Sequence, residues 1–194
     1  MKKIIEKDLE VSLPDEWLPV KMDAEQSFFK KLINRIPNQK VVDIVAIYET
    51  GILMIELSDL RKARNDDKLK LRSNQMEALE FAHKVFDTTA SLYAAHRFSD
   101  DSCAHLTKVV FGTPDNIPLV AILVFVDHPD RVGSNLFQKV HSDMSLRATQ
   151  LLSGLKLKCM VVRPDQIPTT AGWSVCDAAS ASSAQSELQP SEST

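Results

Sequence analysis

Two acidic residues lie inside apolar stretches of the sequence. Asp43 interrupts the run from Lys40 to Tyr48 (KVVDIVAIY), and Glu56 interrupts the run from Ile52 to Ser58 (ILMIELS). Both runs are rich in β-branched residues, which favour β-strands. Burying an isolated carboxylate costs free energy unless it is paired, bound to a cation or neutralised. Two such residues on neighbouring strands are therefore the first candidates for chemistry.

The residues Glu49-Thr50-Gly51 predict a hairpin between the two strands. If Tyr48 faces Gly51 across a two-residue turn, Asp43 lies directly opposite Glu56, with β-carbons within about 5 Å. A shift of one residue would place the acids on opposite faces. Close carboxylates raise each other's pKa unless a metal ion joins them, and such oxygen ligands suit Mg²⁺ or Mn²⁺. The alternatives are acids on a solvated sheet face, or acids paired with an arginine.

Alternating helices and strands are predicted around this hairpin. They are a helix from an N-cap at Asp23 to Ile36, strands over 40–48 and 52–58, a helix over 73–97, a second hairpin with strands over 105–111 and 119–126, a helix from Ser134 to about Ser153 closed by Gly154, and a strand over 155–162. This order predicts an α/β fold with a mixed central sheet and helices on its faces. The first twenty residues are expected to form a lead-in that packs against the core.

Composition limits the class of protein. The chain has 194 residues and a net charge of -3, which argues against a generally cationic nucleic-acid coat. Three widely spaced cysteines indicate neither a disulfide framework nor a zinc site. The longest apolar run, Leu119 to Val126, is too short to span a membrane, and the N-terminus lacks a signal-peptide core. We expect a soluble, cytoplasmic protein with no membrane partner, in which residues 1–176 form one domain and the Ser/Ala-rich residues 177–194 are disordered.

The first helix, the strand carrying Asp43, and the strand ending Ile55-Glu56-Leu57-Ser58-Asp59 together resemble the PD-(D/E)xK nuclease superfamily. In that superfamily a helix precedes the Asp strand, and the Glu strand reads E-x-K. The resemblance covers at most residues 23–170 and implies a restriction-endonuclease-like core, with the helix over 73–97 as an insertion or with a different strand order. It also implies Asp43 and Glu56 as ligands of Mg²⁺ or Mn²⁺, joined by Glu25 on the first helix and by the carbonyl of Leu57. The metal would then activate a phosphodiester for hydrolysis.

The sequence departs from this pattern at Ser58, which stands at the position of the E-x-K lysine. Serine cannot offset the charge that develops on the phosphate. A lysine from elsewhere could do so, and the candidates are Lys62, Lys30, Lys31, Lys40 and Lys84. Lys62 is nearest in the sequence, so the candidate catalytic residues are Ser58 and Lys62.

Three interpretations follow. We expect a degenerate site, with impaired catalysis, in a protein that binds nucleic acid or a protein partner. The alternative is an active Mg²⁺-dependent DNA endonuclease with a displaced lysine, which requires a lysine ammonium within reach of Asp43 and Glu56. The third is another α/β fold in which the two acids are incidental.

A basic segment follows the acidic pair. Six basic residues stand against two aspartates over residues 61–72. This excess predicts contacts with the phosphates of nucleic acid, made by Arg61, Arg64, Lys68 and Lys70. A solvated loop of mixed charge is the alternative, and whether the chain assembles into oligomers stays open.

Overall fold

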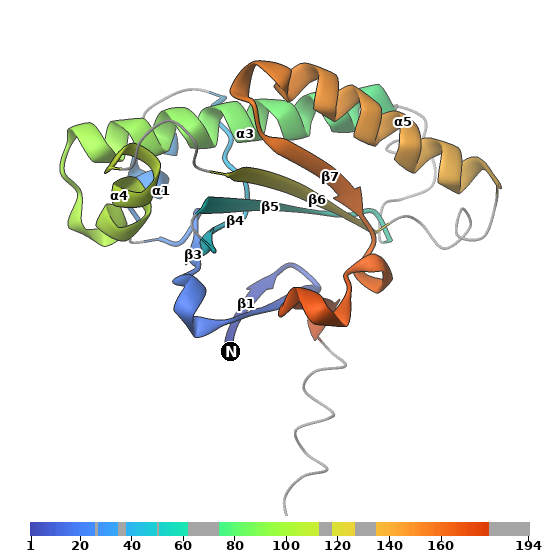
Figure 1. The fold of residues 1–194 in the computed structure, drawn as a ribbon, viewed down its shortest axis with the longest axis horizontal. Helices are drawn as coiled ribbons and strands as arrows, with labels where there is room; N and C mark the ends of the chain where they lie inside the picture. The colour runs from blue at the N-terminus through green and yellow to red at the C-terminus, as the bar shows by residue number, and fades with distance from the viewer. Residues whose placement is uncertain are drawn as a thin grey trace, which may run out of the picture.

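The computed structural model of the chain describes residues 1–25, 27–34, 38–49, 51–61, 74–112, 118–126 and 135–178. These residues form a five-stranded central sheet, a smaller three-stranded sheet and a layer of helices (Figure 1). The predicted α/β class with a mixed central sheet is confirmed.

The central sheet combines an antiparallel half and a parallel half. Its strands, in spatial order, are β3 (Val20–Lys21), β4 (Ile44–Tyr48), β5 (Gly51–Asp59), β6 (Leu119–Val126) and β7 (Lys158–Val162). Strands β3, β4 and β5 pair antiparallel, whereas β5, β6 and β7 pair parallel. The parallel strands therefore all end at the same edge of the sheet.

Helices cover one face of this sheet. They are α1 (Phe28–Ile33), α3 (Asn74–Arg97), α4 (Ala104–Gly112) and α5 (Asn135–Leu152), and α3 and α5 pack side by side over the strands (Figure 1). A parallel pair of strands needs a long crossover connection. Helices α3 and α4 belong to the crossover from β5 to β6, and α5 to the crossover from β6 to β7.

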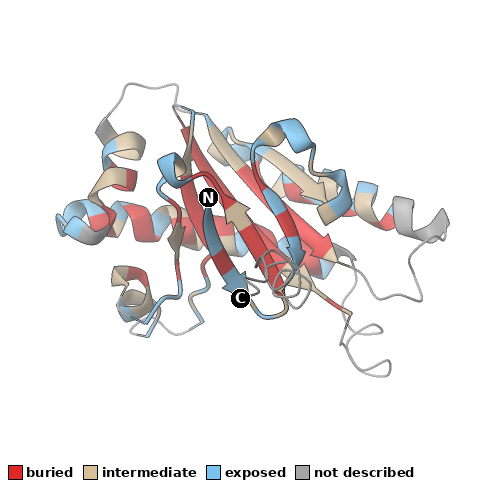
Figure 2. Ribbon diagram, turned by 90° about the horizontal axis from the view of Figure 1, so that it is seen from below, coloured by how far each residue is buried: buried red, intermediate tan, exposed pale blue. Residues whose placement is uncertain are grey.

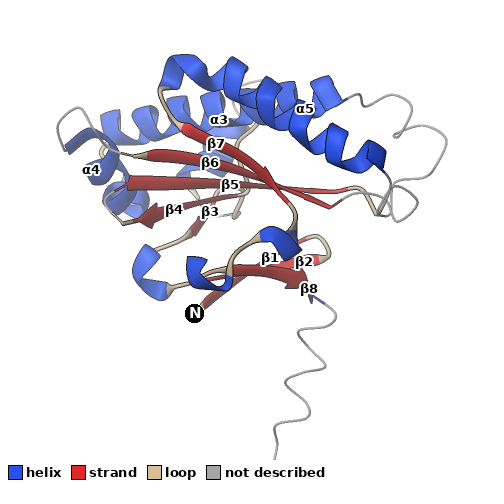
Figure 3. Ribbon diagram, turned by 45° about the vertical axis from the view of Figure 1, so that its right-hand side comes forward, coloured by secondary structure: helices blue, strands red, loops and turns tan. Residues whose placement is uncertain are grey.

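The other face of the central sheet is covered by a second sheet, not by helices as predicted. It consists of β1 (Lys2–Glu6), β2 (Leu9–Leu13) and β8 (Ser174–Asp177), all antiparallel (Figure 3). The predicted lead-in does pack against the core, but it does so as a hairpin. The sequence predicts a disordered tail from residue 177, but Asp177 is the last residue of β8, so this boundary is too early. Residues 179–194 lie outside the described part of the chain.

Short 3-10 helices complete the connections. They are η1 (Asp15–Trp17), η2 (Asp101–Cys103), η4 (Ser153–Leu155), η5 (Pro164–Gln166) and η6 (Thr169–Ala171). The left-handed residue that follows α5 and η4 is Lys156 (φ 51°), not Gly154 as predicted.

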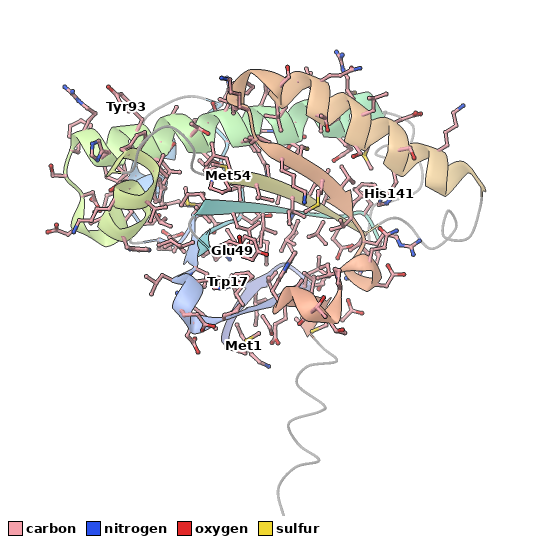
Figure 4. The ribbon with its side chains drawn as sticks, viewed as in Figure 1. Met1, Trp17, Glu49, Met54, Tyr93 and His141 are labelled. Atoms are coloured by element: carbon pink, nitrogen blue, oxygen red, sulfur yellow. The ribbon has the colours of Figure 1, made fainter. Side chains whose placement is uncertain are left out.

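The two faces of the central sheet carry separate apolar cores, visible as buried residues along its strands (Figure 2). Along β5, Ile52 and Met54 face the helices, and Leu53 and Ile55 face the small sheet. Met54 thus lies in the layer between strands and helices (Figure 4). Both faces are buried, which explains why β5 reads as a continuous apolar run.

The strand predicted over residues 105–111 is wrong, because this segment forms α4. Its Val109-Val110 pair is typical of a strand, but Leu106, Val109 and Val110 also have the i, i+3, i+4 spacing of a helix face. Leu106 is fully buried in the helix-side core, with the two valines packed against that core. The predicted hairpin with residues 119–126 is therefore wrong too.

Helix α1 begins later than the predicted N-cap at Asp23. Ser27 is the N-cap, and its hydroxyl oxygen accepts a hydrogen bond from the backbone N–H of Lys30 at 2.9 Å. Serine and aspartate are both good N-caps, so local sequence does not distinguish between them. The consequence is a shorter helix, which leaves residue 25 outside it.

Gly51 provides a test of the packing between β5 and β6. A β-carbon at this position would lie 2.1 Å from the carbonyl oxygen of Pro118, which accepts the hydrogen bond from the Ile52 N–H. We expect Gly51→Ala to lower the free energy of unfolding by about 1–3 kcal/mol, because backbone must shift to relieve the overlap. Gly154→Ala is the matched control, since no atom lies within 4 Å of a β-carbon there. Urea unfolding measures both variants, and equal midpoints would contradict the predicted contact.

Candidate active site

Asp43 and Glu56 meet at the corner where β4 begins. Tyr48 pairs with Gly51 and Ile44 pairs with Ile55, which is the predicted register. Asp43 directly precedes Ile44, and its Oδ2 atom accepts a hydrogen bond from the backbone N–H of Leu57 at 2.7 Å. The predicted register of the hairpin is confirmed, but the strand predicted over 40–48 begins only at Ile44, so Asp43 lies one residue before β4 and not inside the strand.

Glu56 points into the core between β5 and α3. Its neighbours Ile55 and Leu57 belong to the core beneath the small sheet, so alternation turns Glu56 toward the helices. Only 7% of the residue is exposed. Its Oε1 atom accepts a hydrogen bond from the ammonium of Lys84 on α3, whose side chain is 17% exposed. The other oxygen, Oε2, is buried with no hydrogen-bond partner among the described residues.

The three groups shift one another's protonation. Burial, reinforced by the charge of Asp43, raises the pKa of Glu56 to about 8, although Lys84 opposes the shift. Burial also raises the pKa of Asp43, against the opposing effects of Lys84 and the Leu57 N–H. Burial lowers the pKa of Lys84, but the charges of Glu56 and Asp43 outweigh it and the net shift is upward. At pH 7 the carboxylate pair therefore retains a proton beside a charged ammonium.

Lys84 belongs to a polar row on the sheet-facing side of α3. Four polar side chains at helical spacing each bond a partner on the sheet or on the segment before β4. The pairs are Glu77 with Ser58 (3.3 Å), Lys84 with Glu56, Thr88 with the Val42 N–H (3.0 Å), and Ser91 with Gln39 (2.8 Å). These bonds fix the helix lengthwise along the strands, so the ammonium of Lys84 is held over the acidic pair.

The other predicted site residues are placed differently. Ser58 faces α3, where its hydroxyl donates to Glu77. Glu25 is 89% exposed and lies 3.9 Å from Lys30 Nζ, away from the acidic pair. Lys40 binds Glu80 at 3.0 Å. Lys62 lies outside the described residues. Of the candidate lysines that the structure describes, Lys84 is the one that reaches Glu56.

Arg61 forms ion pairs with both sheets and so connects them. Its guanidinium bonds Asp59 at the end of β5 (2.7 Å) and Asp177 at the end of β8. The hydrogen bond with Asp59, followed by that with Asp177, raises the pKa of Arg61. Two carboxylates already neutralise the charge of Arg61. A phosphate, as predicted from the sequence, would compete with Asp59 and Asp177 for the guanidinium. Arg64, Lys68 and Lys70 lie outside the described residues, and their role stays a prediction.

The helical spacing of the sequence distinguishes Lys84 from the other candidate lysines. Lys84 lies three residues after Phe81 and four before Thr88, both of which are buried. Helical spacing therefore puts Lys84 on the buried face of α3. A lysine on that face needs a counter-charge, and the acidic pair is the nearest that the preceding strands supply.

The donor set fits a small hard cation. Mg²⁺ is commonly held by one or two carboxylates, with water and substrate phosphates completing its octahedron. Asp43 and Glu56 supply two carboxylates, and the unpartnered Oε2 of Glu56 is an oxygen with free coordination capacity. Among the described residues, no group of three or more His, Cys, Asp or Glu side chains could hold a metal ion. Any ion here would therefore depend on water or substrate for its other ligands.

Comparison with known proteins found no matching family model, no similar curated protein and no similar solved structure. Within the described part of the chain, no helix has the length and apolar character needed to cross a membrane.

Glu56 is expected to make stability depend on pH. A carboxyl whose pKa is raised by folding stabilises the fold at low pH, and this contribution is lost as pH rises from about 4.5 to about 8. In Glu56→Gln the loss of stability across this window should be smaller, by on the order of 3 kcal/mol. Thermal unfolding at a series of pH values measures the difference. Parallel curves for the two proteins would show that Glu56 ionises normally.

Proposed function

We propose that this chain is a divalent-metal-dependent DNA nuclease of the PD-(D/E)xK type, in which Lys84 replaces the E-x-K lysine. The observation that carries this proposal is the hydrogen bond from the Lys84 ammonium to Glu56, next to Asp43. A lysine within reach of the acidic pair was the requirement that separated an active enzyme from a degenerate one. We therefore favour the active enzyme over the degenerate module that Ser58 had suggested.

The charges of Asp43, Glu56 and Lys84 give these residues different roles in the proposed reaction. Asp43 and Glu56 would hold Mg²⁺ or Mn²⁺, which supplies polarisation of the phosphodiester and a water of lowered pKa. Lys84 remains protonated because the neighbouring carboxylates stabilise its charge. Its ammonium can offset the negative charge that develops on the phosphate. Ser58 has no part in this step, because its hydroxyl is engaged by Glu77.

A second candidate function is binding without catalysis. The contact between Lys84 and Glu56 is nearly buried and gives the acidic pair a neighbouring cation, so it can also serve the fold alone. In that case the acidic pair would be a structural ion-pair cluster, and the protein a nucleic-acid- or partner-binding module. The two functions differ in what happens when Lys84 loses its charge.

Cleavage of plasmid DNA with Mg²⁺ or Mn²⁺ tests the role of Lys84. We expect Lys84→Met to lower the cleavage rate by at least about 100-fold, because it removes the cation that stabilises the developing charge. Lys40→Met is the control, since Lys40 binds Glu80 at the surface. Equal cleavage by Lys84→Met and wild type would refute this role. Mn²⁺ binding by a wild type that never cuts DNA would favour the binding module, with circular dichroism confirming that each variant folds.

Metal binding should depend on pH through Glu56. An ion that needs the ionised carboxylate must displace the proton held there, so the apparent affinity for Mn²⁺ should rise about tenfold per pH unit below about 8 and level off above it. Calorimetric titration in buffers with different ionisation enthalpies measures both the affinity and the proton released. Binding that is independent of pH, with no proton release, would contradict the proposed ligand.

A further inference from the structure

The turn between β1 and β2 carries a lysine in an unusual backbone conformation. Glu6 pairs with Leu9, so Lys7 and Asp8 alone form the turn. Lys7 has φ 55°, a left-handed conformation in which glycine or asparagine is the common choice. Lys7 is exposed, and no carboxylate among the described residues lies within ion-pair distance of it.

The β1 side of this turn is tied to the corner that holds Asp43. Lys21 of β3 binds the carboxylate of Glu6 at 2.9 Å and the carbonyl of Ile5 at 3.0 Å. Lys21 also pairs with Ile44, and the next residue, Met22, donates its N–H to the carbonyl of Asp43 at 2.9 Å. The end of β1 therefore lies beside the first residue of the acidic pair.

The β2 side of the turn is tied to the end of β5. The carbonyl of Asp8 accepts a hydrogen bond from the N–H of Ala178 at 2.9 Å, directly after β8. Arg61 joins Asp177 of β8 to Asp59 of β5. The turn is thus held on both sides at the edge of the central sheet that carries the candidate site.

Lys7 differs from two neighbouring lysines in having no carboxylate partner among the described residues. Lys3 binds Glu10 at 2.9 Å and Lys21 binds Glu6, whereas the ammonium of Lys2 donates to the carbonyl of Pro19 at 2.7 Å. The turn that carries Lys7 lies at the edge of the sheet that holds Asp43 and Glu56, to which Lys21 and Met22 connect it.

We propose that Lys7 binds a phosphate of the DNA backbone when the scissile phosphodiester lies at Asp43 and Glu56. This inference rests on the proposed nuclease function and assigns the β1–β2 turn to the substrate site. An exposed ammonium at the rim of a buried acidic pair attracts the polyanion that the pair itself would repel. The turn, held by Lys21 and by Ala178, positions this charge instead of leaving it on a flexible terminus.

Lys7→Gly removes the charge and keeps the turn, because glycine accepts the left-handed conformation. Lys156→Gly is a matched control: Lys156 is also exposed, has φ 51°, and precedes β7 at the opposite edge of the parallel strands. Binding of a short fluorescein-labelled DNA duplex is measured by anisotropy over a range of salt concentrations, with Ca²⁺ as the cation. Binding of Mn²⁺ to the protein without DNA is measured by calorimetry above pH 8.

Opposite effects on the two ligands are expected for Lys7→Gly. DNA affinity should fall about fivefold, and the slope of log affinity against log salt should decrease by about one. Mn²⁺ affinity should rise about twofold, since a repelling charge has been removed. Lys156→Gly should change neither quantity.

Two results would overturn the inference while leaving the nuclease intact. One is DNA binding by Lys7→Gly that matches Lys156→Gly in a protein that still cleaves. The other is a joint loss of DNA and Mn²⁺ affinity, which indicates that the turn only supports the fold. A wild type that neither binds nor cleaves DNA would instead remove the proposed function, and this inference with it.

Discussion

The ion pair between Glu56 and Lys84 is the interaction around which the helix layer is arranged. A carboxylate in the middle of an apolar strand must be neutralised, and Asp43 beside it adds a second negative charge. Lys84 supplies the counter-charge from α3, which crosses the same strands. Removing Lys84 would leave the buried acidic pair without a cation, which costs more than the loss of a surface salt bridge. The position of α3 along the sheet therefore follows from this pair and from the polar contacts on either side of it.

The two faces of the central sheet are covered by different kinds of contact. The face beneath the small sheet is closed by apolar side chains, including Ile44, Ile55 and Trp173. On the other face the apolar contacts of α3 share the surface with its polar row, whose members bond side chains and backbone of the sheet and of the segment before β4. The proposed site lies where these two kinds of packing meet, at the corner of Asp43.

The role of the E-x-K lysine depends on the place of an ammonium in space, not on its place in the sequence. Ser58 leaves the strand position uncharged, and its hydroxyl is engaged by Glu77. Lys84 lies on a different element and still bonds the glutamate that precedes Ser58 by two residues. A long charged side chain on a helix can replace one on a strand when the helix places it next to the same site. Under the proposed function, Lys84 would supply from α3 the charge that Ser58 does not supply from β5.

Local pattern was sufficient for the hairpin. The two-residue connection after Tyr48 set the register of β4 and β5, and that register continued by one residue brings Asp43 beside Glu56. The helix α3 and the strand β6 also follow from their own sequence. Residues 74–97 form a long segment with helical spacing, and residues 119–126 form an uninterrupted apolar run.

Tertiary packing decided the rest. The β-branched pair in α4 fits a strand or a helix equally well, and packing against α3 selected the helix. Strand β8 joins the hairpin of β1 and β2 only because residues far apart in the sequence pair side by side over an apolar face of the central sheet. The choice of Lys84 among several lysines likewise depended on where a helix crosses a strand. Sequence periodicity reports which face of an element is buried, but not which partner it meets there.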